Sequence, residues 1–181
     1  MTTSSGKLAL FIDGANLQFT AKALGFEIDF KELLSEFASS GTIVCAHYYT
    51  AMLEGAEFQA LRPVTDWLSY NGFAVTTKSA KEFDDGAGRR KIKRNIGVEL
   101  SIDALEIAKY VDEVVLFSGD GDFRRLVEAI QRRGPVVTIV SSVRTKPAMI
   151  TDGLRRQADH FIELDTLRDR IGRPSPTIAP H

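Results

Sequence analysis

The sequence predicts an α/β fold, a three-layer α/β/α sandwich with a mainly parallel, doubly wound sheet. Five short apolar segments bounded by polar residues have the pattern of strands buried on both faces. Segments with helical spacing separate them, and this alternation is typical of βαβ units with helices on both faces of the sheet. The length of 181 residues suits one domain whose core needs no disulfides.

The predicted strands are rich in Val, Ile, Thr, Tyr and Phe, which suit a packed, pleated surface. They cover residues 7–12, 42–50, 72–79, 113–119 and 135–142. The predicted helices cover residues 15–24, 29–39, 54–71, 93–110 and 121–133. Their apolar residues recur every three to four positions, and Gly134-Pro135 provides a stop after the last helix.

The remaining segments divide into loops and a tail. Residues 82–95 are the main predicted loop, because Asp84-Asp85-Gly86 and Gly88 favour turns, and 141–149 is a second break. The tail 173–181 contains three of the six prolines and is predicted to be disordered, so 1–172 forms the single domain. The hydrophobic segment 25–37 fits either the core or a dimer surface. We favour the core, and association of the chain into a homo-oligomer is kept as an alternative.

Composition excludes several classes of protein. With 44% hydrophobic and 26% charged residues, the chain is neither a disordered nor a membrane protein. Cys45 is the single cysteine, which rules out an intramolecular disulfide and is compatible with a reducing compartment. The apolar stretch before Asp13 is too short for a signal peptide, so we expect a cytoplasmic protein without a membrane partner. The net charge of −1 does not by itself indicate a polyanionic partner.

Acidic residues follow two of the predicted strands. Asp13 comes directly after residues 7–12, and Asp120 and Asp122 follow the strand that begins at residue 113. Glu99 and Asp103 are four residues apart and share one face of a predicted helix. Because ligands of open parallel sheets bind outside the carboxyl ends of the strands, these five carboxylates are expected at one edge.

A divalent cation would resolve the repulsion within such a cluster, since adjacent carboxylates resist joint ionisation. Hard oxygen ligands select Mg²⁺ or Mn²⁺. Zinc is not indicated, because His47, His160 and His181 are scattered and only one cysteine is present. Such ions activate water and neutralise charge on phosphate oxygens, so metal-assisted hydrolysis of phosphodiesters is the natural hypothesis.

Each acidic residue also has a purely structural interpretation. Asp13 and Asp120 can make turns or cap the following helices, and Glu99 with Asp103 can form a solvated helix face. Asn16 can hydrogen-bond a carboxylate or a phosphate, or cap a helix. Gly14, Gly119 and Gly121 are expected to let the backbone turn tightly beside the acids, and Ser118 can add a hydroxyl or merely form the turn.

A basic run precedes the helix that carries Glu99. It comprises Arg89, Arg90, Lys91, Lys93 and Arg94, which are candidates for RNA binding. Arg124, Arg125, Arg132 and Arg133 can add to the same positive field. A solvated loop is the alternative. Phe83 and Tyr110 can stack on bases, although core packing is the favoured interpretation for both.

Three motifs together resemble a known family. FIDGANL (11–17), GVELSIDALEIA (97–108) and FSGDGDFRRLVEAIQRRG (117–134) look like the signature blocks of NYN domains, specifically the LabA-like group of the PIN-like nuclease superfamily. The closing stretch DGLRRQADHFIEL (152–164) is also similar to that group. The resemblance covers about 7–165 and depends on the ordered combination of motifs.

The resemblance implies a PIN-like, Rossmann-like α/β/α domain that binds Mg²⁺ or Mn²⁺ and cleaves RNA, with single-stranded RNA as the expected substrate. Asp13, Asp103, Asp120 and Asp122 match the family's acidic positions, and Asn16 its asparagine. Glu99 occupies a position where members of the family often have Asp. The Glu side chain is longer by one methylene group. These six residues are the expected site, with Asp13, Glu99, Asp103, Asp120 and Asp122 as metal ligands. A non-catalytic RNA-binding or regulatory module and a phosphatase for small phosphoesters are the alternatives.

Overall fold

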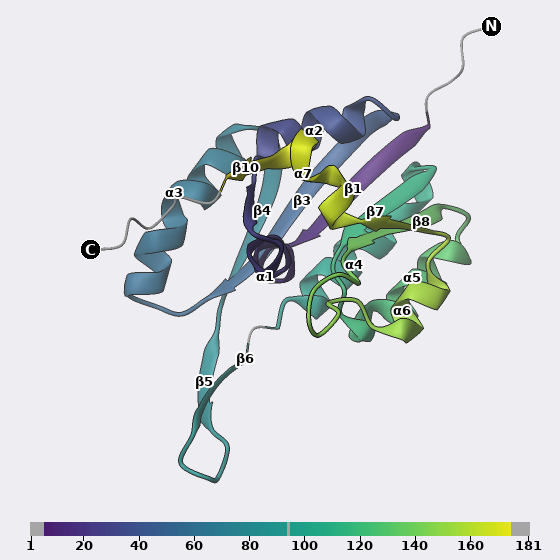
Figure 1. The fold of residues 1–181 in the computed structure, drawn as a ribbon. Helices are drawn as coiled ribbons and strands as arrows, with labels where there is room; N and C mark the ends of the chain where they lie inside the picture. The colour runs from purple at the N-terminus through teal and green to yellow at the C-terminus, as the bar shows by residue number, and fades with distance from the viewer. Residues whose placement is uncertain (1–5, 94, 175–181) are drawn as a thin grey trace, which may run out of the picture.

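A six-stranded parallel sheet forms the centre of the computed structural model, which describes residues 6–93 and 95–174 (Figure 1). The strand order is β4-β3-β1-β7-β8-β9. The strands are β1 (Lys7–Asp13), β3 (Thr42–Met52), β4 (Phe73–Ser79), β7 (Glu113–Phe117), β8 (Val136–Ser141) and β9 (His160–Glu163). All five predicted strands are present. The sixth, β9, escaped prediction because its four residues, HFIE, are only half apolar.

Helices cover both faces of this sheet, which confirms the predicted three-layer sandwich. One face packs against α1 (Gly14–Leu24), α2 (Phe30–Ala38), α3 (Ala56–Tyr70) and α7 (Arg168–Ile171). The other packs against α4 (Gly97–Ile107), α5 (Arg124–Gln131) and α6 (Asp152–Gln157). Short 3₁₀ turns occupy Ala108–Tyr110, Gly121–Phe123 and Leu164–Leu167. Among the helices of residues 6–93 and 95–174, none combines the length and apolarity needed to cross a membrane.

The core consists of two hydrophobic clusters, one on each face of the sheet. Strand β1 supplies both, because successive side chains of a strand point to opposite faces. Ala9 and Phe11 belong to the cluster beneath α4 and α5, while Leu10 and Ile12 belong to the cluster beneath α1 and α2. Residues Ala9 to Ile12 are fully buried, so β1 is fixed from both sides and holds its last residue, Asp13, in place.

The segment 25–37 lies in the core, as the sequence favoured. It forms β2 (Phe26–Ile28) and α2, and its five largest buried side chains are Phe26, Ile28, Phe30, Leu33 and Phe37. Asp29 caps α2 by accepting hydrogen bonds from the backbone N–H groups of Lys31 and Glu32. Each fully buried side chain of this kind stabilises the fold by roughly 1.5–3 kcal/mol.

The predicted loop at residues 82–95 is instead mainly a β-hairpin. Strands β5 (Lys81–Asp84) and β6 (Arg90–Lys93) pair antiparallel and project from the body of the molecule (Figure 1). The turn residues that suggested a loop form the tip, where Asp84 and Asp85 accept hydrogen bonds from backbone N–H groups of residues 86–89. Composition alone could not distinguish this turn from a loop, since both use Asp and Gly.

The fold extends past the predicted C-terminal boundary at residue 172. Strand β10 (Gly172–Pro174) pairs antiparallel with β2, so Arg173 and Pro174 belong to the folded part. The second predicted break is confirmed, because the chain from Ser142 to Thr151 contains no helix or strand. Residues 175–181 lie outside the described residues, and a disordered tail there stays a prediction.

Candidate active site at the carboxyl ends of β1 and β7

The ends of two adjacent central strands bring Asp13 and Ser118 together. Strand β1 pairs with β7 up to Ile12 and Phe117, so the residues that follow emerge side by side. The Ser118 hydroxyl donates to Asp13 Oδ2 at 3.0 Å and accepts from the backbone N–H of Asp120 at 3.2 Å. Ser118 therefore links the first acidic residue to the turn that carries the next two.

Asp13 is a buried carboxylate, only 8% exposed. It caps α1, because its Oδ1 accepts a hydrogen bond from the backbone N–H of Asn16 at 3.3 Å. Burial raises the pKa of Asp13, and the nearby charge of Asp120 raises it further, while the hydrogen bonds from Asn16 and Ser118 partly oppose the shift. An ion that replaced the lost hydration would favour the charged form.

Asn16 fixes the position of the second acidic turn. Its side-chain Oδ1 accepts a hydrogen bond from the backbone N–H of Gly119 at 3.0 Å. Asn16 lies inside α1 and is not its cap, so the capping alternative was wrong for Asn16 and applies to Asp13. The side-chain carbonyl of Asn16 is thus occupied by a hydrogen bond within the protein. Its side-chain N–H groups are the part of the amide that can contact a ligand.

Asp120 and Asp122 lie with Asp13 along one cleft. Asp120 accepts a hydrogen bond from the backbone N–H of Asp122 at 3.0 Å and so begins the 3₁₀ turn before α5. The cleft has a volume of about 430 Å³. Its lining comprises Asp13, Asn95, Ile96, Gly97, Val98, Ser101, Ile102, Leu105, Asp120, Asp122 and Phe123. Three carboxylates thus face an otherwise largely apolar wall contributed by α4.

Two positions beside the acids require glycine, because neighbouring atoms leave no space for a Cβ. A Cβ on Gly14 would lie 2.4 Å from the Tyr48 ring, and one on Gly119 would lie 2.2 Å from the carbonyl oxygen of Met149. Neither residue has a positive φ, so the expected explanation from backbone freedom was wrong for both. Close packing between neighbouring segments is the physical reason.

Glu99 and Asp103 share one face of α4, as predicted, and this face is turned toward β3 and β4. Glu99 Oε1 accepts a hydrogen bond from Lys78 Nζ at 2.7 Å, which lowers the pKa of Glu99. Asp103 Oδ2 accepts from the Tyr49 hydroxyl at 2.6 Å. In the described part of the chain, neither carboxylate lines the cleft. The five acids therefore form two groups, one lining the cleft and one on the face of α4 that contacts β3 and β4.

The group around Asp103 contains two aromatic residues of β3. His47 stacks on Phe11 with ring centroids 5.2 Å apart and on Tyr49 at 6.1 Å. Burial lowers the pKa of His47, while the charge of Asp103 acts in the opposite direction. Burial and the bond to Asp103 raise the pKa of Tyr49. Tyr49 therefore stays a neutral hydrogen-bond donor that holds Asp103.

The donor chemistry of the cleft suits a hard divalent cation. Asp13, Asp120 and Asp122 offer carboxylate oxygens to the cleft. Glu99 Oε2, on the other side of α4, is a buried oxygen without a hydrogen-bond partner. Within residues 6–93 and 95–174, however, no three acidic, His or Cys side chains are arranged to hold an ion together. The residue types fit a metal, whereas a complete ligand set is not assembled.

The candidate RNA-binding residues of the described chain lie outside the lining of the cleft. Arg90, Lys91 and Lys93 lie on β6, Arg89 lies just before it, and Arg94 is outside the described residues. Arg124, Arg125, Arg132 and Arg133 lie on or next to α5. Phe83 and Tyr110 are 47% and 60% exposed, so the expectation of core packing was wrong for both.

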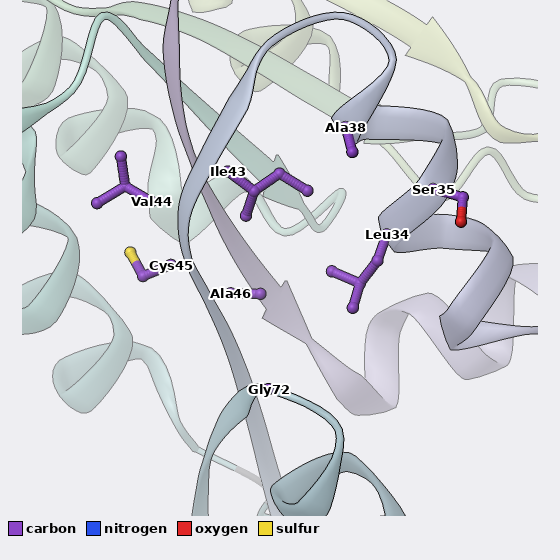
Figure 2. Close-up of a pocket in the computed structure, with 8 residues that line it drawn as sticks. All are labelled: Leu34, Ser35, Ala38, Ile43, Val44, Cys45, Ala46 and Gly72. Atoms are coloured by element: carbon purple, nitrogen blue, oxygen red, sulfur yellow. The ribbon is translucent and has the colours of Figure 1, made fainter.

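A second hollow lies at the opposite edge of the sheet, where β3 begins. It has a volume of about 320 Å³ and lies between α2 and residues Ile43–Ala46 of β3 (Figure 2). Its lining is apolar except for Ser35 and the half-buried thiol of Cys45, whose pKa is raised by burial. Without a carboxylate or a basic side chain, this hollow lacks the groups that would hold a hard divalent cation or a phosphate.

Four residues at the two acidic groups were missed by the sequence. Tyr49 and Lys78 lie near the carboxyl ends of β3 and β4, and the rule that selected Asp13 could have found them. Tyr49 pairs directly with Asp13 in register. Asn95 and Ser101 line the cleft. Ser101 stands between Glu99 and Asp103 in sequence, and the helical repeat places it on another face of α4.

Comparison with known proteins agrees with this architecture. The NYN domain family matches residues 7–165. The chain is 34% identical over 186 residues to the low amplitude and bright protein LabA of Synechococcus elongatus, covering 99% of this chain and 96% of that protein. A crystal structure of a Vibrio parahaemolyticus protein of unknown function has a TM-score of 0.74 and 28% identity, covering 96% of this chain and 99% of that one. The chain therefore belongs to the NYN domain family, as a LabA-like member.

Proposed function

We propose that the chain is a metal-dependent ribonuclease that hydrolyses RNA phosphodiester bonds in the cleft at the carboxyl ends of β1 and β7. NYN domains are generally nucleases, which supports a nuclease-type, RNA-related function. The observation that carries the proposal is the buried carboxylate of Asp13 beside Asp120 and Asp122 in one cleft. A buried acid with a raised pKa in a cleft is characteristic of functional sites.

The proposed cofactor is Mg²⁺ or Mn²⁺, held by Asp13, Asp120 and Asp122. When bound, the ion would polarise the phosphate and lower the pKa of a water molecule. Ser118 and Asn16 hold the acidic turn against the start of α1. Asp103 was expected to bind the same ion, but it lies outside the cleft lining, and it is now proposed, with Glu99, to serve a second ion or to position water. The reaction is proposed to occur in the cytoplasm.

The wall of the cleft supports a nucleic-acid substrate. Val98 and Ile102 of α4 are 60% and 53% exposed, and both line the cleft. Exposed apolar side chains beside an acidic site suit the faces of bases and sugars, which an inorganic phosphate would not contact. The basic residues of β6 are proposed to bind the flanking phosphates of single-stranded RNA.

A cleavage assay tests this function. Purified protein is expected to degrade a fluorescently labelled single-stranded RNA with Mg²⁺ or Mn²⁺, and Asp13→Asn to abolish the cleavage. The Asn side chain keeps a capping oxygen for α1, so loss of activity would not reflect loss of the helix cap. Asp66→Asn is the matched control, since Asp66 is an exposed acid paired with Arg62 on α3. Equal activity of the Asp13→Asn protein would refute the assignment.

A non-catalytic RNA-binding or regulatory module is the second candidate. It is favoured by the incomplete ligand set in residues 6–93 and 95–174 and by the Lys78–Glu99 pair. Binding of RNA without turnover in Mg²⁺, Mn²⁺, Co²⁺ and Ni²⁺ would support this alternative over the ribonuclease.

A further inference from the structure

The projecting hairpin of β5 and β6 has two chemically different faces. In an antiparallel pair, directly opposed residues share a face and successive residues alternate. The register pairs Lys81 with Lys93 and Phe83 with Lys91, so these four residues share one face. The other face carries Glu82, Asp84, Arg90 and Ile92. One face is therefore cationic and aromatic, while the other has mixed charge.

Ion pairs engage some of the hairpin's basic residues and not others. Arg90 lies 4.0 Å from Glu82, and Arg89 and Lys91 both approach Asp85 at the tip, at 3.2 and 3.8 Å. Lys81 and Lys93 form no ion pair with any residue of the described ranges 6–93 and 95–174. Of the basic residues in this hairpin, these two have the charges that are most available to a ligand.

The cationic face has a cost in the free protein. Like charges directly opposite in an antiparallel pair are destabilising, and Lys81 faces Lys93. All eight strand residues are exposed, and a two-stranded hairpin without a packed face is marginally stable. Phe83 is 47% exposed on the same face as the lysines. A polyanion with flat apolar groups would both relieve the repulsion and cover this ring.

We propose that the Lys81, Phe83, Lys91 and Lys93 face binds the single-stranded RNA that flanks the cleft, with a base stacked on Phe83 and phosphates on the lysines. This proposal rests on the proposed function for the identity of the substrate. The hairpin is connected to the cleft by the chain itself, since β6 ends at Lys93 and Asn95 already lines the cleft. Each strand of the hairpin has four residues, which span about 13 Å.

The four residues make complementary contributions. Base–aromatic stacking tolerates any sequence, because every base has a flat face, and lysines bind phosphates irrespective of the base. This face is therefore selective for unpaired strands and not for sequence. Duplex RNA is expected to bind it weakly, because paired bases are not free to stack on Phe83.

The experiment measures binding of the full chain to a fluorescent single-stranded RNA in EDTA, by anisotropy across a salt series. The Lys81→Gln/Lys93→Gln protein is expected to bind less tightly and to show a salt slope lower by about 1.4, the loss of two phosphate contacts. Phe83→Ala is expected to weaken binding by about 5-fold or more with the salt slope unchanged. Duplex RNA of the same sequence is expected to compete poorly with the labelled strand.

Matched controls separate this face from the rest of the surface. Ile92→Ser removes a similarly exposed side chain, 44% exposed, from the opposite face of the hairpin. Lys22→Gln/Lys31→Gln removes two charges from α1 and α2. Both control proteins are expected to bind RNA like the parent. Circular dichroism of each variant confirms that the domain is folded.

Two outcomes would overturn the proposal. One is parental affinity and salt slope in the Lys81→Gln/Lys93→Gln protein. The other is displacement of the RNA by polyglutamate as readily as by single-stranded RNA, with Phe83→Ala unchanged, which would indicate an acidic protein partner. Because binding is measured without a divalent cation, the result is independent of cleavage. A parent that binds through this face and cleaves no RNA would refute only the ribonuclease, whereas cleavage with unaffected hairpin variants would refute only the hairpin proposal.

Discussion

Asp13 combines a structural and a chemical role in one side chain. It caps α1 and accepts a hydrogen bond from Ser118, yet burial and the charge of Asp120 raise its pKa. Ionised Asp13 is therefore less stable in the folded protein than an exposed aspartate would be. A bound cation would compensate for this, which is a physical reason for the chain to keep a carboxylate here.

The raised pKa of Asp13 predicts an unusual dependence of stability on pH. The folded state holds the Asp13 proton more tightly than the unfolded state, so the contribution of Asp13 to the free energy of unfolding falls as the pH rises above 3.8. The Asp13→Asn substitution removes this dependence of the free energy of unfolding on pH. In EDTA, the Tm of Asp13→Asn relative to the parent is expected to be higher at about pH 7 than at about pH 4.

Asp165 provides a control of opposite sign. Hydrogen bonds from Arg144 and Arg168 lower the pKa of Asp165, so its stabilising contribution is present at neutral pH and is lost as the pH falls below 3.8. Asp165→Asn is expected to lower the Tm more at neutral pH than in acid. A pH-independent Tm difference for Asp13→Asn would contradict the assigned shift.

Gly119 predicts a steric effect next to the site. A Cβ there would meet the carbonyl oxygen of Met149 at 2.2 Å and Ser141 Oγ at 2.6 Å, so the chain after β8 must move. Gly119→Ala is expected to lower the free energy of unfolding by about 1–3 kcal/mol, measured by urea denaturation. Gly153→Ala, in α6, is the control: its nearest neighbouring atom is 3.7 Å away, and a gain of about 0.4–1 kcal/mol is expected. Equal effects of the two substitutions would contradict the steric explanation.

Helix α4 divides the acidic residues between two sides. Val98, Ser101 and Ile102 face the cleft, whereas Glu99 and Asp103 contact residues of β4 and β3. The Lys78 ammonium group pairs with Glu99 Oε1, the oxygen that a metal ion could otherwise bind. Glu99 Oε2 is buried without a hydrogen bond. This arrangement makes Lys78 a competitor for any ion that Glu99 could bind.

Removal of Lys78 therefore tests whether Glu99 belongs to the metal site. Lys78→Gln is expected to raise the affinity for Mn²⁺ by up to about fivefold, which corresponds to ~1 kcal/mol for an exposed ion pair. Isothermal titration calorimetry with Mn²⁺ measures the change. Arg62→Gln frees a carboxylate on α3 and is expected to leave the affinity unchanged. Unchanged affinity of Lys78→Gln would instead exclude Glu99 as a ligand.

At the scale of the whole molecule, the chain closes on itself through β10. Gly172–Pro174 pair with Phe26–Ile28, and Arg173 lies 3.6 Å from Asp29. Strand β10 thus ties the C-terminal part of the described chain to the layer of α1, α2 and α7. This contact explains why the fold continues past the predicted boundary at residue 172.

Two truncations test where the domain ends. A chain that ends at Pro174 is expected to keep the Tm of the full chain, as the sequence-based prediction of a disordered tail implies. A chain that ends at Ile171 loses the pairing with β2 and is expected to lose about 1–3 kcal/mol. Differential scanning calorimetry compares them, and an equal loss in both would show that 175–181 contribute to the fold.

The sequence predicted the fold class well because the strands are apolar on both faces. Continuous runs such as 7–12 and 113–117 suit only a sheet covered by helices on both sides, and the helical repeats between them require parallel connections. The short segments β9 and β10 and the hairpin escaped prediction, because pairing with other strands defines them more than their own residues do.

By itself, the sequence determined which residues end the first strand and which follow β7, and hence the expectation that Asp13 and the Ser118–Asp122 turn meet at one edge of the sheet. The predicted parallel arrangement of the strands and their hydrophobic pattern suffice for that inference. Only the tertiary structure decided how α4 is rotated, which side chains Lys78 and Tyr49 engage, and which lysines of the hairpin share a face with Phe83. Those outcomes depend on contacts between segments far apart in the chain, which no local pattern encodes.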